Sequence, residues 1–87
     1  MPEKTVTVTN KAGLHARTAA VFVQKAQEFA CAISVIRDGK EVSAKSIMGI
    51  MTLGISQGTV ITIKAEGEGS PEAVAALAQL VQAFADM

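Results

Sequence analysis

The dipeptide Asp38-Gly39 is the feature that most limits what this chain can fold into. Both residue types tolerate the positive φ angles that a two-residue hairpin turn requires. Residues 32–37, which precede the dipeptide, are rich in β-branched side chains, and residues 40–43 follow it directly. We therefore expect strands over 32–37 and 40–43 that pair back on each other in an antiparallel sheet.

Two other segments have the patterns of strands. Residues 5–9 alternate between threonine and valine with period two, which is typical of a half-buried strand. Residues 59–65 are dominated by threonine, valine and isoleucine, and we expect the fourth strand there.

Three segments with helical patterns separate and follow these strands. The first helix is expected over 16–28, with an apolar face formed by Ala19, Phe22, Val23, Ala26 and Ala30. A short helix is expected between Ser46, a good N-cap, and Gly54. The last helix should begin with Ser70 as N-cap and Pro71 in its first turn, and bury Val74, Leu77, Val81 and Phe84. The order βαββαβα favours an α+β fold, with an antiparallel sheet covered by helices on one face.

Length and composition limit the size of the domain and the class of its partners. We expect the 87 residues, 1–87, to form one small domain. Apolar residues make up 49% of the chain, but only three residues are aromatic, so the core must be mainly aliphatic. The formal net charge of zero argues against nucleic acid as the main partner.

Cysteine content and hydropathy indicate where such a chain works. Cys31 is the only cysteine and lies among apolar residues, so we expect a buried thiol in a reducing compartment. The longest uncharged stretch is interrupted by glycine and polar residues and should not span a membrane. Residues 1–5 have no apolar signal core, and we expect a cytoplasmic protein.

His15 is the only histidine, and it stands directly before the first predicted helix in Asn10-Lys11-Ala12-Gly13-Leu14-His15-Ala16-Arg17. A helix start presents unpaired N–H groups and partial positive charge, which suit a phosphate and disfavour the imidazolium form. A neutral imidazole has the lone pair needed to accept a phosphoryl group, and Arg17 would stabilise that group. The alternative is that His15 only caps the helix. A metal site is not expected, because no further ligand lies at suitable spacing.

The short helix after Ser46 is apolar almost all round. Because so short a helix buries one face, we expect Ile50 and Leu53 to point inward and the other apolar side chains to point outward: Ile47, Met48 and Met51. Exposed methionines adapt to differently shaped partners, although all five side chains could instead be core. Ser46 is either a plain N-cap or a phosphorylation site, where about two added negative charges would change binding and leave the fold intact.

These two motifs, Asn-Lys-Ala-Gly-Leu-His-Ala-Arg and Lys-Ser-Ile-Met-Gly-Ile-Met-Thr-Leu-Gly, resemble HPr, the histidine phosphocarrier of the bacterial phosphoenolpyruvate-dependent sugar phosphotransferase system. The resemblance covers essentially the whole chain and implies the HPr open-faced β-sandwich, with four antiparallel strands and three helices on one face. It implies that His15 accepts phosphate on Nδ1 from phosphorylated enzyme I and passes it to enzyme IIA components, with Arg17 as the phosphate partner. The resemblance implies no cofactor, and a carrier rather than an enzyme, since the chain has no paired acid and base.

The second motif resembles HPr of the Gram-positive type, in which HPr kinase/phosphorylase modifies Ser46 and the product acts as corepressor with a LacI-type catabolite repressor. In that family the surface that docks partners beside His15 and Arg17 comprises Ala20, Ile47, Met48, Met51 and Gly54. A monomer is the expected state. Two alternatives remain open. One is a regulatory paralogue that acts as a corepressor-type binding module, although the presence of His15 argues against it. The other is a nitrogen-branch phosphocarrier.

One position departs from the family pattern. Many HPr sequences have proline after the His-Ala-Arg motif, whereas this chain has Thr18. Proline favours the first turn of a helix and lacks an N–H group. We therefore expect Thr18 to change the rigidity of the helix start or the transfer rate without abolishing the carrier role.

Overall fold

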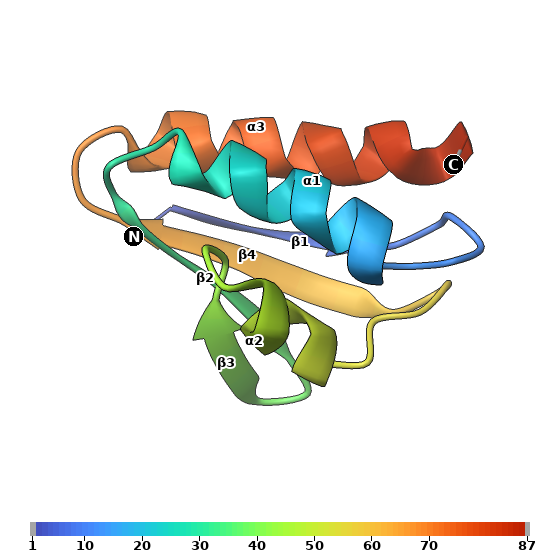
Figure 1. The fold of residues 1–87 in the computed structure, drawn as a ribbon. Helices are drawn as coiled ribbons and strands as arrows, with labels where there is room; N and C mark the ends of the chain where they lie inside the picture. The colour runs from blue at the N-terminus through green and yellow to red at the C-terminus, as the bar shows by residue number, and fades with distance from the viewer. Residues whose placement is uncertain (1, 87) are drawn as a thin grey trace.

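The computed structural model describes residues 2–86, and over them the chain forms a four-stranded antiparallel sheet with three α-helices on one face (Figure 1). The elements follow one another as β1 (Glu3–Thr7), α1 (Ala16–Gln27), β2 (Ala32–Arg37), β3 (Lys40–Ser43), α2 (Ile47–Thr52), β4 (Val60–Glu66), α3 (Ser70–Ala83) and a short 3-10 turn, η1 (Phe84–Asp86). The predicted α+β open-faced sandwich is confirmed.

The sheet has the strand order β1-β4-β2-β3, so the last strand of the chain lies in its interior. Strand β4 pairs with β1 from Glu3↔Lys64 to Thr7↔Val60, and with β2 on its other side. The predicted hairpin joins β2 to β3, with φ of 49° at Asp38 and 81° at Gly39. Periodicity predicts the strands but contains no information on which distant strands pair, because each strand would alternate in the same way in any order.

The core lies between the sheet and the helices. Alternate side chains of the strands point toward α1 and α3, among them Val6, Val35, Ile61 and Ile63, which are 5% exposed or less. Phe22 and Phe84 are the two largest fully enclosed side chains, and Cys31 is buried as predicted. Each such aliphatic or aromatic side chain contributes about 1.5–3 kcal/mol relative to an exposed one. The opposite face of the sheet is polar where Thr5 and Thr62 share a hydrogen bond of 3.1 Å between their hydroxyls.

Several predicted element boundaries are shifted. Strand β1 starts and ends two residues before the predicted 5–9, because its ladder with β4 already begins at Glu3. Strand β4 covers Val60–Glu66, one residue later than predicted. Helix α1 ends at Gln27, one residue early, and Ala30 lies beyond it and is exposed. The expectation that Ala30 belongs to the buried face was therefore wrong.

The start of α3 also differs from the prediction. Gly69 is the N-cap, with φ of 81°, and Ser70 is the first helical residue, with its side chain buried. The segment before α3 has positive φ at both Gly67 and Gly69, which serine adopts rarely. Glycine therefore occupies the turn, and the capping position moves back by one residue.

Candidate functional site

His15 is the N-cap residue of α1, in extended conformation with φ of −119° and ψ of −165°, and it is exposed. Its carbonyl oxygen accepts the first intrahelical hydrogen bond, from the N–H of Ala19 at 2.7 Å. The N–H groups of the first helical turn have no intrahelical acceptor. The imidazole therefore lies beside the positive end of a helix, where a phosphate would be stabilised.

The loop before His15 is pressed against the segment that follows α2. Gly13 has φ of +65°, and a side-chain carbon there would overlap the carbonyl oxygen of Ile55 and come within 2.7 Å of Ser56 Cα. The N–H of Leu14, whose side chain is buried, donates to the same carbonyl of Ile55 at 3.1 Å. Only glycine fits this conformation and this close approach.

Polar side chains also hold the loop from within. Asn10 Nδ2 donates to the Gly13 carbonyl oxygen at 2.9 Å, and the Thr18 hydroxyl donates to the same oxygen at 2.6 Å. Thr18 Oγ1 accepts in turn from the N–H of His15 at 3.2 Å. The sequence analysis identified Thr18 only as a departure from a pattern, and it included Asn10 in the motif around His15 without assigning it a role. A threonine three residues after an N-cap was the available signal, since side chains at that position often bond back to the cap.

Arg17 lies in the first turn of α1, two residues after His15, and is exposed. The ion pairs among the side chains of residues 2–85 are Lys25–Glu28 and Arg37–Asp38, so neither uses the Arg17 guanidinium. It is therefore available to an anion that approaches His15.

Helix α2 has the side-chain distribution that its sequence predicts. Ser46 is its N-cap, and its hydroxyl oxygen accepts from the N–H of Gly49 at 3.1 Å. Ile50 and Leu53 are buried, whereas the other three apolar side chains are exposed: Ile47 by 40%, Met48 by 79% and Met51 by 45%. The alternative in which all five are core is wrong.

Helices α1 and α2 contact each other, and both lie on the helical side of the sheet (Figure 1). The half-buried Ala20 is on α1, five residues after His15, and Gly54 follows α2 and is exposed. Together with the contact of Leu14 with Ile55, this places the His15 loop and α2 in one neighbourhood. The role of these side chains in binding partners stays a prediction.

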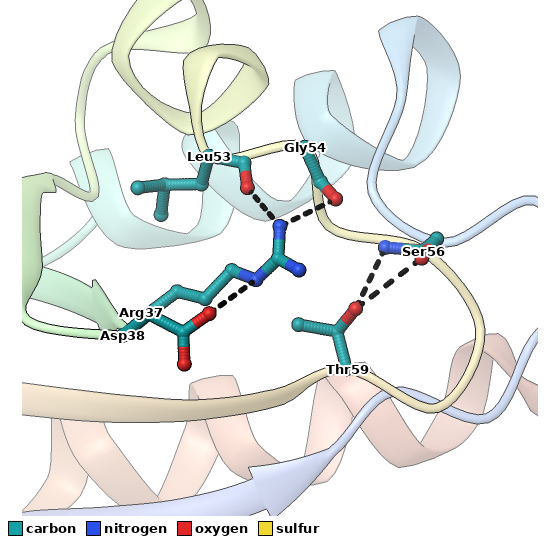
Figure 2. Close-up of polar contacts among 6 residues, drawn as sticks. All are labelled: Arg37, Asp38, Leu53, Gly54, Ser56 and Thr59. Carbon is teal, nitrogen blue, oxygen red and sulfur yellow. Dashed lines mark hydrogen bonds and ion pairs between the residues drawn. The ribbon is translucent and has the colours of Figure 1, made fainter.

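Arg37, at the end of β2, holds the other end of α2. Its Nη1 donates to the carbonyl oxygens of Leu53 and Gly54, the second at 2.8 Å, while its Nε lies 3.7 Å from Asp38 Oδ2 (Figure 2). The carbonyls at the end of a helix lack intrahelical donors, so a cation there is stabilising. Sequence reasoning missed Arg37, because its acceptors are 16 and 17 residues away and meet it only in the folded chain.

Two negative findings apply to the part of the chain that the structure describes, residues 2–86. No group of three or more histidine, cysteine, aspartate or glutamate side chains is placed to hold a metal ion. No helix in this range has the length and apolar character needed to cross a membrane.

The chain is therefore an open-faced βαββαβα sandwich that displays a histidine at the start of its first helix. The family model described as "PTS HPr component phosphorylation site" matches residues 2–83. The HPr-like protein Crh of Bacillus subtilis is 49% identical over 82 residues, which are 94% of this chain and 96% of Crh. The phosphocarrier protein HPr of Xylella fastidiosa is 48% identical over 82 residues, covering 94% and 92% of the two chains. The chain belongs to the HPr family of phosphocarriers.

Solved structures agree with this assignment. An HPr of Thermoanaerobacter tengcongensis superimposes with a TM-score of 0.95 at 50% identity, covering all of this chain and 98% of the other. Crh of Bacillus subtilis, described as a swapped dimer, gives 0.77 at 48% identity, with 97% of each chain covered. A dimeric HPr from Thermoanaerobacter tengcongensis gives 0.76 at 53% identity, with 95% of each covered. Because dimers occur among these similar proteins, the expected monomeric state of this chain stays a prediction.

Proposed function

We propose that this protein is a cytoplasmic phosphocarrier of the sugar phosphotransferase system. It accepts a phosphoryl group on Nδ1 of His15 from phosphorylated enzyme I and passes it to enzyme IIA components. The observation that carries the proposal is the position of His15, exposed and at the N-cap of α1 in a chain of the HPr family.

The transfer makes and breaks one bond to phosphorus at each step. The lone pair of neutral imidazole Nδ1 attacks phosphorus while the bond between phosphorus and enzyme I breaks. In the second step a nucleophile of enzyme IIA attacks phosphorus while the bond between phosphorus and Nδ1 breaks, and the electron pair of that bond returns to Nδ1. The first-turn N–H groups of α1 and the Arg17 guanidinium stabilise the phosphate dianion on His15. Interactions at a helix terminus contribute about 0.3–2 kcal/mol, which is modest enough for the group to leave again.

The protein itself supplies an acceptor and a docking surface, and its partners supply the remaining catalytic groups. His15 and Arg17 are both exposed, so two different partner proteins can reach them in turn. The exposed apolar side chains of α2 support docking of such partners: Ile47, Met48 and Met51. Ala20 and Gly54 complete the proposed surface. We propose that the chain needs no cofactor.

A second function is favoured by the similarity to Crh and by Ser46. We propose that HPr kinase/phosphorylase phosphorylates Ser46 and that the product binds a LacI-type catabolite repressor. Ser46 is half-buried at the start of α2, where its oxygen already accepts a backbone N–H. A phosphate there keeps an acceptor for that N–H and adds about two negative charges beside Ile47 and Met48. The binding surface changes while the helix is retained.

The test is incubation with phosphoenolpyruvate and enzyme I, followed by intact mass, ³¹P NMR and brief acid treatment. We expect one added phosphate that acid removes, as for a phosphohistidine, and none on His15→Ala. Incubation with ATP and HPr kinase/phosphorylase should label both the unmodified protein and His15→Ala, but not Ser46→Ala. If enzyme I leaves this chain unlabelled while it labels a control HPr, the carrier function is wrong and the Ser46-centred regulatory paralogue is favoured. A nitrogen-branch carrier would instead accept phosphate only from a different donor.

A further inference from the structure

The hydroxyl of Thr18 connects two points of the backbone that lie on either side of Leu14. Its proton goes to the carbonyl oxygen of Gly13 at 2.6 Å, and its oxygen accepts the N–H of His15 at 3.2 Å. Thr18 is only 2% exposed, so these hydrogen bonds are formed away from solvent. One buried hydroxyl therefore fixes both ends of the peptide segment that leads into His15.

The carbonyl of Gly13 is held by a second donor as well. Asn10, 1% exposed, donates Nδ2 to it at 2.9 Å, so both lone pairs of that oxygen are engaged within the loop. A carbonyl oxygen carries partial negative charge and would repel a phosphate dianion. Two buried donors keep this oxygen inside the loop and away from the space around the exposed imidazole.

The N–H of His15 is directed to the same hydroxyl. An N-cap residue has extended backbone, and its own N–H points away from the helical hydrogen bonds, so it needs a partner outside the helix. In this chain the partner is the side chain three residues later. Because a hydrogen bond to His15 N restrains φ of His15, it also restrains the direction of the Cα–Cβ bond that carries the imidazole.

We propose that Thr18 is a positioning residue for phosphoryl transfer: its hydroxyl holds the Gly13–His15 backbone so that Nδ1 of His15 and the first-turn N–H groups converge on the same phosphate. The inference rests on the proposed carrier function and adds to it a residue that does not touch the phosphate. Proline at position 18 would also restrain the first turn, through its fixed φ, but would form neither hydrogen bond. The two kinds of restraint can therefore be separated by experiment.

The test compares Thr18→Val, which keeps the shape and removes the hydroxyl, with Thr18→Ser and Thr18→Pro. Initial rates of transfer from phosphorylated enzyme I are measured over a range of carrier concentrations, so that kcat and KM are obtained separately. Thr18→Val removes both hydrogen bonds of the hydroxyl, and we expect it to lower kcat about tenfold, with KM within about twofold. Thr18→Ser should restore kcat, and Thr18→Pro should not restore it fully.

Amide hydrogen exchange of the unmodified protein gives a second readout that needs no variant. The N–H of His15 should exchange more slowly than those of Ala16 and Arg17 in the same turn. Equal exchange would overturn the proposal, as would a Thr18→Val protein that is less stable but transfers with unchanged kcat, or a Thr18→Ser protein that fails to recover. Failure of the carrier function is distinguishable, because then the unmodified protein itself would accept no phosphoryl group, and both proposals would fall together.

Discussion

The loop before α1 packs against the segment that follows the short helix α2, but the loop and the helix are stabilised in different ways. In the loop, backbone groups of Gly13, Leu14 and His15 are all hydrogen-bonded to fixed partners, and a glycine permits a close approach to Ile55. Helix α2 instead leaves Ile47, Met48 and Met51 exposed, while Ile50 packs into the core and hydrogen bonds hold the two ends of the helix. The proposed phosphoryl acceptor therefore depends on backbone geometry, whereas the proposed docking surface depends on adaptable side chains.

The largest effect on stability is expected at Gly13, where the loop before α1 contacts Ile55 and Ser56. Gly13→Ala combines a positive φ with overlap of Ile55 and Ser56, and should lower the free energy of unfolding by about 3 kcal/mol. Gly58→Ala is the matched control, because Gly58 has φ of +88° but open space around it, and it should cost about 1 kcal/mol. Urea unfolding of both variants measures the difference. Equal losses would show that conformational strain alone, and not the close approach, makes Gly13 necessary.

A smaller effect is expected at the C-terminal end of α2. Arg37→Gln removes the charged donor to Leu53 and Gly54, and should lower stability by about 1.5 kcal/mol and speed hydrogen exchange in α2. Lys40→Gln removes a charge from the exposed side of the same hairpin and should change stability by less than about 0.5 kcal/mol. If both variants behave alike, Arg37 does not hold α2 in place.

Two substitutions at Ser46 separate its capping of α2 from the effect of a negative charge at the same position. Ser46→Ala should cost about 1 kcal/mol through loss of the acceptor for Gly49 N. Ser46→Asp keeps an acceptor and should be about as stable as the unmodified protein, while the added charge alters binding of partners to α2. Thermal unfolding and a binding titration with enzyme I test the two expectations separately. A strongly destabilised aspartate variant would contradict the view that a charge at this position leaves the helix intact.

The smallest effect on stability is expected on the exposed face of α2. Met48→Ala removes a side chain that is 79% exposed and should leave the free energy of unfolding within about 0.5 kcal/mol. The same change should raise KM for transfer from enzyme I and leave kcat nearly constant, which is the reverse of the pattern expected for Thr18→Val. An unchanged KM would exclude Met48 from the docking surface.

Local patterns predicted much of this molecule. Residue alternation located the first strand, β-branched composition located the second and fourth, and the Asp38-Gly39 turn placed the third. Ser46 with Gly54 bounded α2. Each of these signals depends on neighbours in the sequence. The interior position of β4 and the bonds of Arg37 depend on residues far apart in the chain, and periodicity contains no signal for them. The N-cap of α3 is Gly69 and not the predicted Ser70, because the positive φ that the turn requires outweighs the preference of serine for capping positions.

The site itself was only partly foreseeable. His15 and Arg17 could be proposed because a lone histidine before a helix is a local feature. Asn10 and Thr18 also act locally, but their common acceptor, the Gly13 carbonyl, becomes available only in the particular loop conformation that Gly13 adopts. The side chains that would contact a phosphate are therefore easier to predict from the sequence than the side chains that hold the loop in place.

If His15 carries a phosphoryl group as proposed, its exposure limits the time for which that group can be stored. Water can reach a phosphoryl group that is held at the surface, so hydrolysis of that group competes with its transfer to an acceptor. Under the proposed function, the protein would be a short-lived reservoir, and the abundance of waiting acceptors would determine how much of its phosphate reaches them.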